Sequence, residues 1–304
     1  EQAVKSTEKR IEELENRLSR TKADSLVSGL NRDGSIRHLT YDYWNLIARA
    51  KEYRDATNGA FDITIAPVMD AWGFTGDSFR VPEQSELDTL LKKVNSDAIQ
   101  MLGSPSDSVT LGEGQAIDLG GIAKGYTSDL VEQTFRANGI ESGKISLGGN
   151  VFVLGGKPDG SDWRVGIKDP RNESGLAAIL SLRDAYAITS GGYERYFEEN
   201  GKTYHHIIDP ATGYPADSGL LSVTVVADAN GPDWAGAGNG TMCDAFSTAL
   251  FVMGEEQALD FWRNGGYDFD LVLVTEDGRV VITAGLADRF EEVKDSGYTY
   301  ETVS

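Results

Sequence analysis

The feature that most constrains the fold of this 304-residue chain is a change of pattern near residue 97. Beyond it, short β-rich runs separated by turn residues predominate, and helical segments interrupt them at 122–140, 241–254 and 255–265. Before it, apolar spacing predicts amphipathic helices at 5–20, 40–57 and 83–95. Strands and helices do not alternate in strict β-α-β order, so the pattern predicts an α+β fold.

We expect one elaborated domain over residues 1–304, with a helical part at about 1–95 and a β-rich catalytic part at about 96–304. We also expect a break in the helical pattern at 25–35, a helix start helped by Ser85, and a strand-like run at 116–121. A hairpin with a Glu-Asp-Gly turn is expected at 269–285, and a loop at 231–240.

The formal net charge of −20 restricts the partners. It argues against nucleic acid, whose affinity comes mostly from Lys and Arg on phosphates. An anionic substrate would need a locally positive site or a bound cation, although the charge is also explained by solubility alone. No apolar run is long enough to predict a transmembrane helix. The single cysteine, Cys243, excludes an intramolecular disulfide.

A glycine pair stands where a β-rich run meets a strong helix, in the segment IDLGGIAKG at 117–125. Backbone N–H groups at such a helix start can bind phosphate oxygens, and glycine lets the backbone approach closely. Lys124 adds a positive charge one turn into the helix. The segment is neither a Walker loop nor a dinucleotide fingerprint, so a plain tight turn stays an alternative.

Asp244 and Thr248 are four residues apart in a predicted helix, so their side chains share a face. A carboxylate and a hydroxyl suit part of a Mg²⁺ site, because Mg²⁺ usually takes further ligands from water and substrate phosphates. Thr241-x-x-Asp244 also resembles a capping box, in which Asp244 only satisfies a helix end. Both interpretations stay open, and Thr248 favours the metal because a cap does not need it.

Two of the three histidines, His205 and His206, are adjacent in a strand predicted at 204–208. Neighbouring strand residues point to opposite faces, so both cannot line one pocket. A neutral histidine in a pocket could accept a proton from an attacking hydroxyl. The alternative is an exposed or hydrogen-bonded strand histidine.

Two further segments offer groups that could contact a ligand. The Ser-Gly-Gly turn at 190–192 provides backbone donors, while Tyr193 and Arg195 provide stacking and charge. Trp72 and Phe74 could stack on a planar ring, although aromatic pairs lie more often in a core.

Six motifs follow one another along the chain: AFDITIAPVMDAWGF, IDLGGIAKGY, SLGGN, ITSGGYERYF, HHIIDPATGYP and CDAFSTALFVMG. In this order they closely resemble the ApbE family, whose members are FAD:protein FMN transferases once labelled thiamine-biosynthesis lipoproteins. The upstream segment SLVSGLN also looks like that family. The resemblance covers roughly residues 10 to 290.

The resemblance implies the family's own α+β domain, with FAD in a cleft between two lobes. It implies Mg²⁺ held by Asp244, Thr248 and a main-chain oxygen of Gly121, and it places His206 near the reacting phosphate. The positions that it matches to FAD contacts, with neighbouring residues of the same motifs, are Trp72, Gly73, Phe74, Asp118, Gly120, Gly121, Lys124, Ser190, Gly191, Tyr193, Arg195, His206, Ile207 and Ile208.

With the resemblance, His206 and Asp244 become the expected catalytic residues. His206 would deprotonate a threonine or serine of the acceptor, and Mg²⁺ would stabilise the AMP leaving group. FAD is the expected substrate, and the expected acceptor is an Nqr- or Rnf-type subunit or another extracytoplasmic flavinylated protein. The resemblance also implies a periplasmic lipoprotein tethered to the inner membrane, with an anchor outside this sequence.

Two alternatives stay open. A Mg²⁺-dependent FAD pyrophosphatase would use the same site, with water in place of the acceptor hydroxyl. A non-enzymatic flavin-binding lipoprotein would need no metal at the diphosphate, so the set of Asp244, Thr248 and His206 argues against it.

Overall fold

The computed structural model of the chain describes residues 2–76, 78–104, 107–231 and 238–304. Most of the loop predicted at 231–240 therefore lies outside the described residues. The helices are α1 (Gln2–Leu18), α2 (Leu26–Asp33), α3 (Tyr41–Ala56), α4 (Ala66–Trp72), α5 (Gln84–Leu90), α6 (Ala123–Ala137) and α7 (Asn239–Asn264), with 3₁₀ turns η1 (Ile63–Ile65), η2 (Leu91–Lys93), η3 (Ser96–Ala98) and η5 (Ala284–Arg289).

The strands are β1 (Ser35–Ile36), β2 (Gln100–Leu102), β3 (Ser108–Thr110), β4 (Gly143–Leu147), β5 (Asn150–Leu154), β6 (Trp163–Asp169), β7 (Asn172–Leu182), β8 (Ala185–Gly191), β9 (Tyr196–Glu199), β10 (Lys202–His205), β11 (Leu220–Asp228), β12 (Asp270–Thr275), β13 (Arg279–Thr283), β14 (Phe290–Glu292) and β15 (Thr299–Val303). Among the described residues, β15-β13-β12-β11-β8-β5-β4 form the largest sheet, and β14-β7-β6 form a second.

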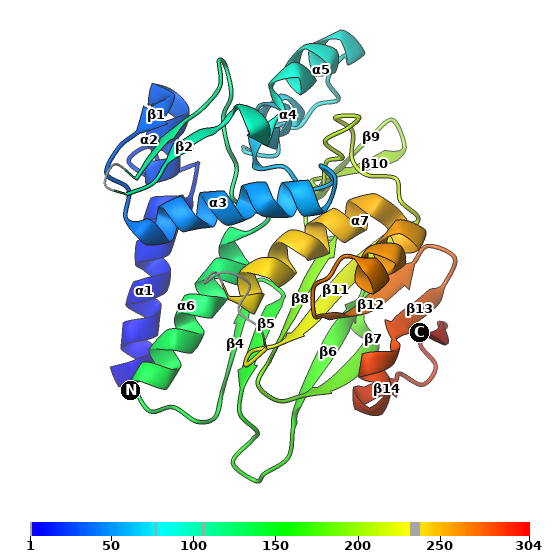
Figure 1. Ribbon diagram of the computed structural model, residues 1–304. Helices are drawn as coiled ribbons and strands as arrows, with labels where there is room; N and C mark the ends of the chain where they lie inside the picture. Colours follow the sequence, from blue (N-terminus) through cyan, green and yellow to red (C-terminus); the bar gives the residue numbers. More distant parts are fainter. Residues whose placement is uncertain (1, 77, 105–106, 232–237) are drawn as a thin grey trace.

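The large sheet is covered on both faces. Helices α6 and α7 cross each other on one face, where α7 packs on β8 and β11 (Figure 1). The β14-β7-β6 sheet packs on the other face through small and branched apolar side chains such as Val165, Leu180 and Val272. Layers of helix on sheet and sheet on sheet confirm the predicted α+β class.

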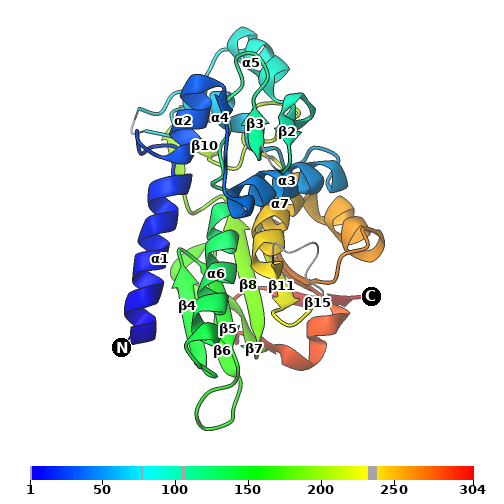
Figure 2. The ribbon, with the colours of Figure 1, turned by 60° about the vertical axis from the view of Figure 1, so that its left-hand side comes forward.

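The remaining elements stand at one end of these layers. Helices α3, α4 and α5, the small β1-β3-β2 sheet and the β9–β10 hairpin gather there (Figure 1). Helix α1 runs along α6, as both views show, so the first residues of the chain reach back to the central layers (Figure 2). Among the residues described, no helix combines the length and the apolar character needed to span a membrane.

Most predicted elements are present. Helices occur at each of the predicted positions, and the hairpin at 269–285 is the antiparallel pair β12–β13. The two helices predicted at 241–265 form α7, which breaks at Gly254, where φ is 79°. That backbone conformation favours glycine.

Four local predictions are wrong in whole or in part. The strand predicted at 204–208 ends at His205 in β10, so His206 lies beyond it. Residues 25–35 hold helix α2, because the Ser25 side chain accepts a hydrogen bond from the Ser28 N–H and the helix buries Val27 and Leu30. Ser85 lies inside α5, which begins after Glu83. No strand forms at 116–121, where the backbone turns towards α6 instead.

Candidate functional site

A cavity of about 540 Å³ lies where the N-terminal helices meet α6, α7 and the end of β8. This volume is within the range of small-molecule sites. Its lining residues are Ile11, Leu14, Glu15, Leu18, Ser19, Arg20, Thr21, Ala60, Phe61, Asp62, Ile65, Met69, Phe74, Thr75, Asp118, Leu119, Gly120, Gly121, Ala123, Lys124, Thr127, Leu147, Ser190, Glu194, Arg195, His206, Ile207, Ile208, Pro210, Asp244 and Thr248.

The Gly-Gly turn enters this cavity directly before α6. The Asp118 carboxylate accepts a hydrogen bond from the Gly120 N–H at 2.7 Å and shapes the turn. A Cβ built on Gly121 would lie 3.1 Å from the Phe61 ring and 3.4 Å from Thr248 Oγ1. A side chain at Gly121 would therefore press on one wall of the cavity and on a predicted metal ligand.

Asp244 and Thr248 lie on α7 and both line the cavity. Asp244 is 2% exposed, and burial raises the pKa of its carboxyl, which the charge of Lys124 opposes. Its two oxygens accept hydrogen bonds from the Gly125 N–H at 2.8 Å and from Asn150 Nδ2 at 2.9 Å. The capping-box interpretation is wrong, because Asp244 lies inside α7, which begins at Asn239, and its carboxylate caps the start of α6 instead.

These residues fit a magnesium ion. The Asp244 carboxylate, the Thr248 hydroxyl and the backbone of Gly121 bring hard oxygen atoms to one part of the cavity. Within the described part of the chain, no group of three or more His, Cys, Asp or Glu side chains could hold a metal. Mg²⁺ suits such a sparse set, because it commonly binds through one or two carboxylates and substrate phosphates.

His206 follows β10 and lines the cavity, whereas His205 turns away. Nδ1 of His206 lies 3.1 Å from the carbonyl oxygen of Arg195, which can only accept, so Nδ1 carries the proton and Nε2 keeps its lone pair. Burial, together with smaller effects of the nearby Lys124 and Arg195 charges, lowers the pKa of His206 to about 4. His205 instead lies 3.0 Å from the Ala216 carbonyl and packs on Phe251.

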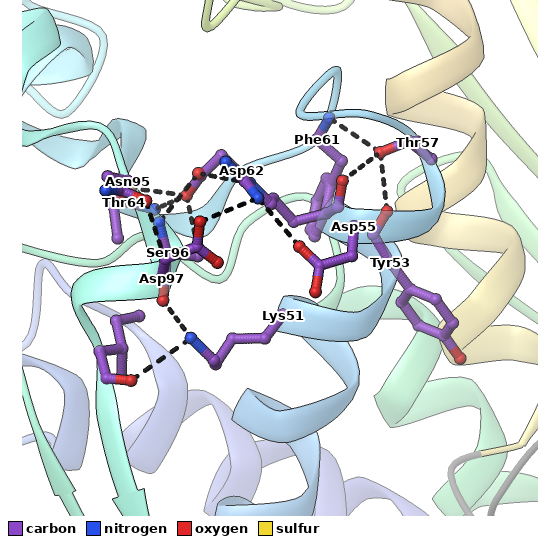
Figure 3. Close-up of polar contacts among 12 residues, drawn as sticks. Lys51, Tyr53, Asp55, Thr57, Phe61, Asp62, Thr64, Asn95, Ser96 and Asp97 are labelled. Carbon is purple, nitrogen blue, oxygen red and sulfur yellow. Dashed lines mark hydrogen bonds and ion pairs between the residues drawn. The ribbon is translucent and has the colours of Figure 1, made fainter.

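A polar network fixes the loop around Asp62, which lies beside the Gly-Gly turn (Figure 3). The buried Asp62 carboxylate accepts hydrogen bonds from the N–H and hydroxyl of Thr64 and from the Ser96 hydroxyl, at 2.6–2.8 Å. The Thr57 hydroxyl accepts from the Phe61 N–H at 3.3 Å. Phe61 and Ile65 line the cavity, and these bonds fasten the loop that holds them to α3 and η3.

Four of the predicted FAD contacts do not line the cavity. Trp72 is fully buried, and its Nε1 donates to the Gly213 carbonyl at 2.7 Å. Gly73 ends α4 with φ of 82°. Gly191 pairs with Ser222 in the sheet, and the Tyr193 ring packs against Gly191. The other ten predicted positions line the cavity together with Asp244 and Thr248.

Several lining residues had no predicted role. Arg20 donates to Asp118 at 3.2 Å and to Asp70 at 2.7 Å, so the end of α1 is tied to the Gly-Gly turn. Glu194 lies 4.0 Å from the Lys124 ammonium, and burial raises the pKa of its carboxyl. Nothing in the local pattern around Arg20 or Glu194 marks them, because their partners are distant in sequence.

The sequence relationship agrees with this arrangement. Residues 2–271 match the model of the ApbE family. The chain belongs to the ApbE family. The match to the family model confirms the resemblance carried by the six motifs, and its range includes every cavity residue named above.

Relatives of the ApbE chain resemble it along almost its whole length. It is 33% identical to the FAD:protein FMN transferase of Klebsiella pneumoniae, covering 95% of this chain and 86% of that one. It is 31% identical to the FAD:protein FMN transferase of Treponema pallidum, covering 96% and 82%. The crystal structure of the ApbE protein of Thermotoga maritima superposes with a TM-score of 0.82 at 31% identity, covering 96% and 89%.

Proposed function

We propose that this ApbE chain is a Mg²⁺-dependent FAD:protein FMN transferase. It cleaves the diphosphate of FAD, attaches FMN through a phosphoester bond to a threonine or serine of a flavoprotein, and releases AMP. The observation that carries this proposal is one cavity lined both by His206, whose Nδ1 is bonded so that Nε2 is left to accept a proton, and by Asp244, Thr248 and Gly121. The names of its relatives support the same reaction.

The cavity residues suit the binding of an anionic substrate by an acidic protein. Lys124 brings a positive charge beside the Gly-Gly turn, and the N-terminus of α6 favours phosphate oxygens. Asp244, Thr248 and the Gly121 carbonyl would hold Mg²⁺. When bound, the ion would neutralise charge on the diphosphate and stabilise the departing phosphate.

His206 supplies the proton transfer. The acceptor hydroxyl oxygen forms a bond to the phosphorus of FMN, and the bridging P–O bond of FAD breaks with its electron pair going to AMP. Nε2 of His206 takes the hydroxyl proton, because Nδ1–H stays bonded to the Arg195 carbonyl. A pKa lowered to about 4 keeps His206 neutral and able to accept this proton at neutral pH.

Mass spectrometry tests this proposal directly. The protein is incubated with FAD, Mg²⁺ and an Nqr- or Rnf-type subunit that does not yet carry FMN, which is the acceptor class that we propose. A mass gain of one FMN on the acceptor is expected, and EDTA should abolish it. Free FMN and AMP without acceptor modification would instead indicate a pyrophosphatase, and intact FAD would indicate a binding protein.

A further inference from the structure

Asp129 is a buried carboxylate that takes no part in the chemistry described above. It lies on α6, one turn beyond Gly125, and is 3% exposed. It accepts hydrogen bonds from the backbone N–H groups of Gly240 and Thr241, each at 2.8 Å, and from the Thr241 hydroxyl. Both N–H groups belong to the first turn of α7, whose N-cap Gly238 has no side chain. Asp129 therefore caps α7 from a neighbouring helix.

The capping is reciprocal. Asp244 of α7 accepts from the Gly125 N–H in the first turn of α6, so each helix supplies the carboxylate that caps the other. Such bonds need the two backbones to approach closely. A Cβ on Gly125 would lie 2.1 Å from the Gly240 carbonyl oxygen, and one on Gly240 would lie 2.8 Å from that of Gly125. The two glycines mark the crossing point, and the two carboxylates bond across it.

We propose that Asp129 is a positioning residue for the metal seat, by which we mean the proposed Mg²⁺ site of Asp244, Thr248 and Gly121. The hydrogen bonds that Asp129 accepts from the first turn of α7 hold the register of α7 against α6. The inference rests on the proposed function, because it concerns the same metal. A one-residue slide of a helix moves a side chain by about 1.5 Å and turns it by about 100°. Such a slide would carry Asp244 and Thr248 away from Gly121. Asp244 and Thr248 lie on α7, and Gly121 lies in the turn that leads into α6, so the register of the two helices decides whether the oxygens meet.

Metal affinity tests this inference in a readout separate from turnover. Mn²⁺ binding is measured by electron paramagnetic resonance with ADP present, at pH 8, for the full chain and for Asp129→Asn. Asparagine has nearly the same volume as aspartate, but its amide NH₂ would face one of the groups that now donate a hydrogen bond to Asp129. We expect the Mn²⁺ dissociation constant to rise about 10–100-fold, as for other residues that orient metal ligands.

Asp169→Asn is the matched control. Asp169 on β6 is also a buried carboxylate, and it accepts from the Arg171 N–H at 2.8 Å and the Tyr298 hydroxyl at 2.6 Å. Its replacement should lower stability and leave Mn²⁺ affinity unchanged. A merely structural Asp129 would behave in the same way, so unchanged Mn²⁺ affinity in Asp129→Asn would overturn the inference.

Two further variants keep the test decisive. If Asp129→Asn does not fold, Thr241→Val removes the hydroxyl bond to Asp129 and should weaken Mn²⁺ binding in the same direction. Wild-type Mn²⁺ affinity in Thr241→Val would count against the inference. Asp244→Ala separates the two proposals. If Asp244→Ala loses Mn²⁺ affinity while Asp129→Asn keeps it, only the role of Asp129 is overturned. If Asp244→Ala keeps wild-type Mn²⁺ affinity, the metal seat itself is overturned.

Discussion

His206 shows how one side chain obtains its chemistry from its surroundings. A solvent-exposed histidine has a pKa near 6.5, but burial lowers the pKa of His206 to about 4. A lowered pKa means that the neutral form persists to lower pH. We therefore expect the imidazole to titrate near pH 4 in ¹H–¹⁵N NMR, where only three histidines are present and His206→Ala assigns the signal. A midpoint near 6.5 would contradict the buried environment.

The kinetic role of His206 is tested against its neighbour. His206→Ala should lower the transfer rate about 10²–10⁴-fold with little change in FAD affinity, as expected for the loss of a general base. His205→Ala is the control, because His205 faces Ala216 and Phe251 rather than the cavity. Equal rate losses in the two variants would remove the base role from His206.

Asp244 combines a cap and a proposed metal ligand, and two substitutions separate these roles. In Asp244→Asn, the amide oxygen can still accept from the Gly125 N–H. Oδ1 of Asn150 is buried and has no hydrogen-bond partner among the described residues, so it could accept from the new amide nitrogen once the Asn150 amide flips. We expect thermal stability close to wild type but Mg²⁺ affinity reduced by about tenfold or more, because the charge is lost. Asp244→Ala should lose both, including about 0.5–2 kcal/mol for the cap. Normal Mg²⁺ affinity in Asp244→Asn would reject the metal role.

At the scale of elements, the crossing of α6 and α7 decides where the site can form. Gly125→Ala would place a methyl group 2.1 Å from the Gly240 carbonyl oxygen, so the helices must separate. We expect a loss of about 1–3 kcal/mol in the free energy of unfolding, measured in urea. Gly29→Ala on α2 is the control, since its Cβ meets only Arg32 at 3.9 Å. Equal stability in the two variants would contradict the close crossing.

At the scale of the whole molecule, the cavity joins segments from α1 to α7. A ligand that binds all of them should stabilise the native state as a unit, by about 2.7 kcal/mol at a concentration 100 times its dissociation constant. We expect FAD with Mg²⁺ to raise the melting temperature in calorimetry, and EDTA to remove most of the rise. An equal rise with EDTA would show that FAD binding does not require the metal.

The sequence alone determined the features that depend on short-range patterns. Apolar periodicity indicated the helices at 40–57 and 122–140, alternating β-rich runs indicated the sheets, and ordered motifs indicated the ApbE family. The i, i+4 spacing also correctly placed Asp244 and Thr248 on one face of a helix, because both lie in α7. The strand predicted at 116–121 does not form, because the β-rich composition of this run contains no sign of the turn held by Asp118.

Only the tertiary structure decided which of these groups meet. Trp72 and Phe74 belong to one motif, yet packing buries Trp72 against Tyr204 and Tyr214 and leaves Phe74 at the cavity. Arg20 reaches Asp118 across 98 residues, and Asp129 reaches Thr241 across 112. The physical reason is that hydrogen bonding, burial and desolvation depend on neighbours in space, which a local sequence pattern does not contain.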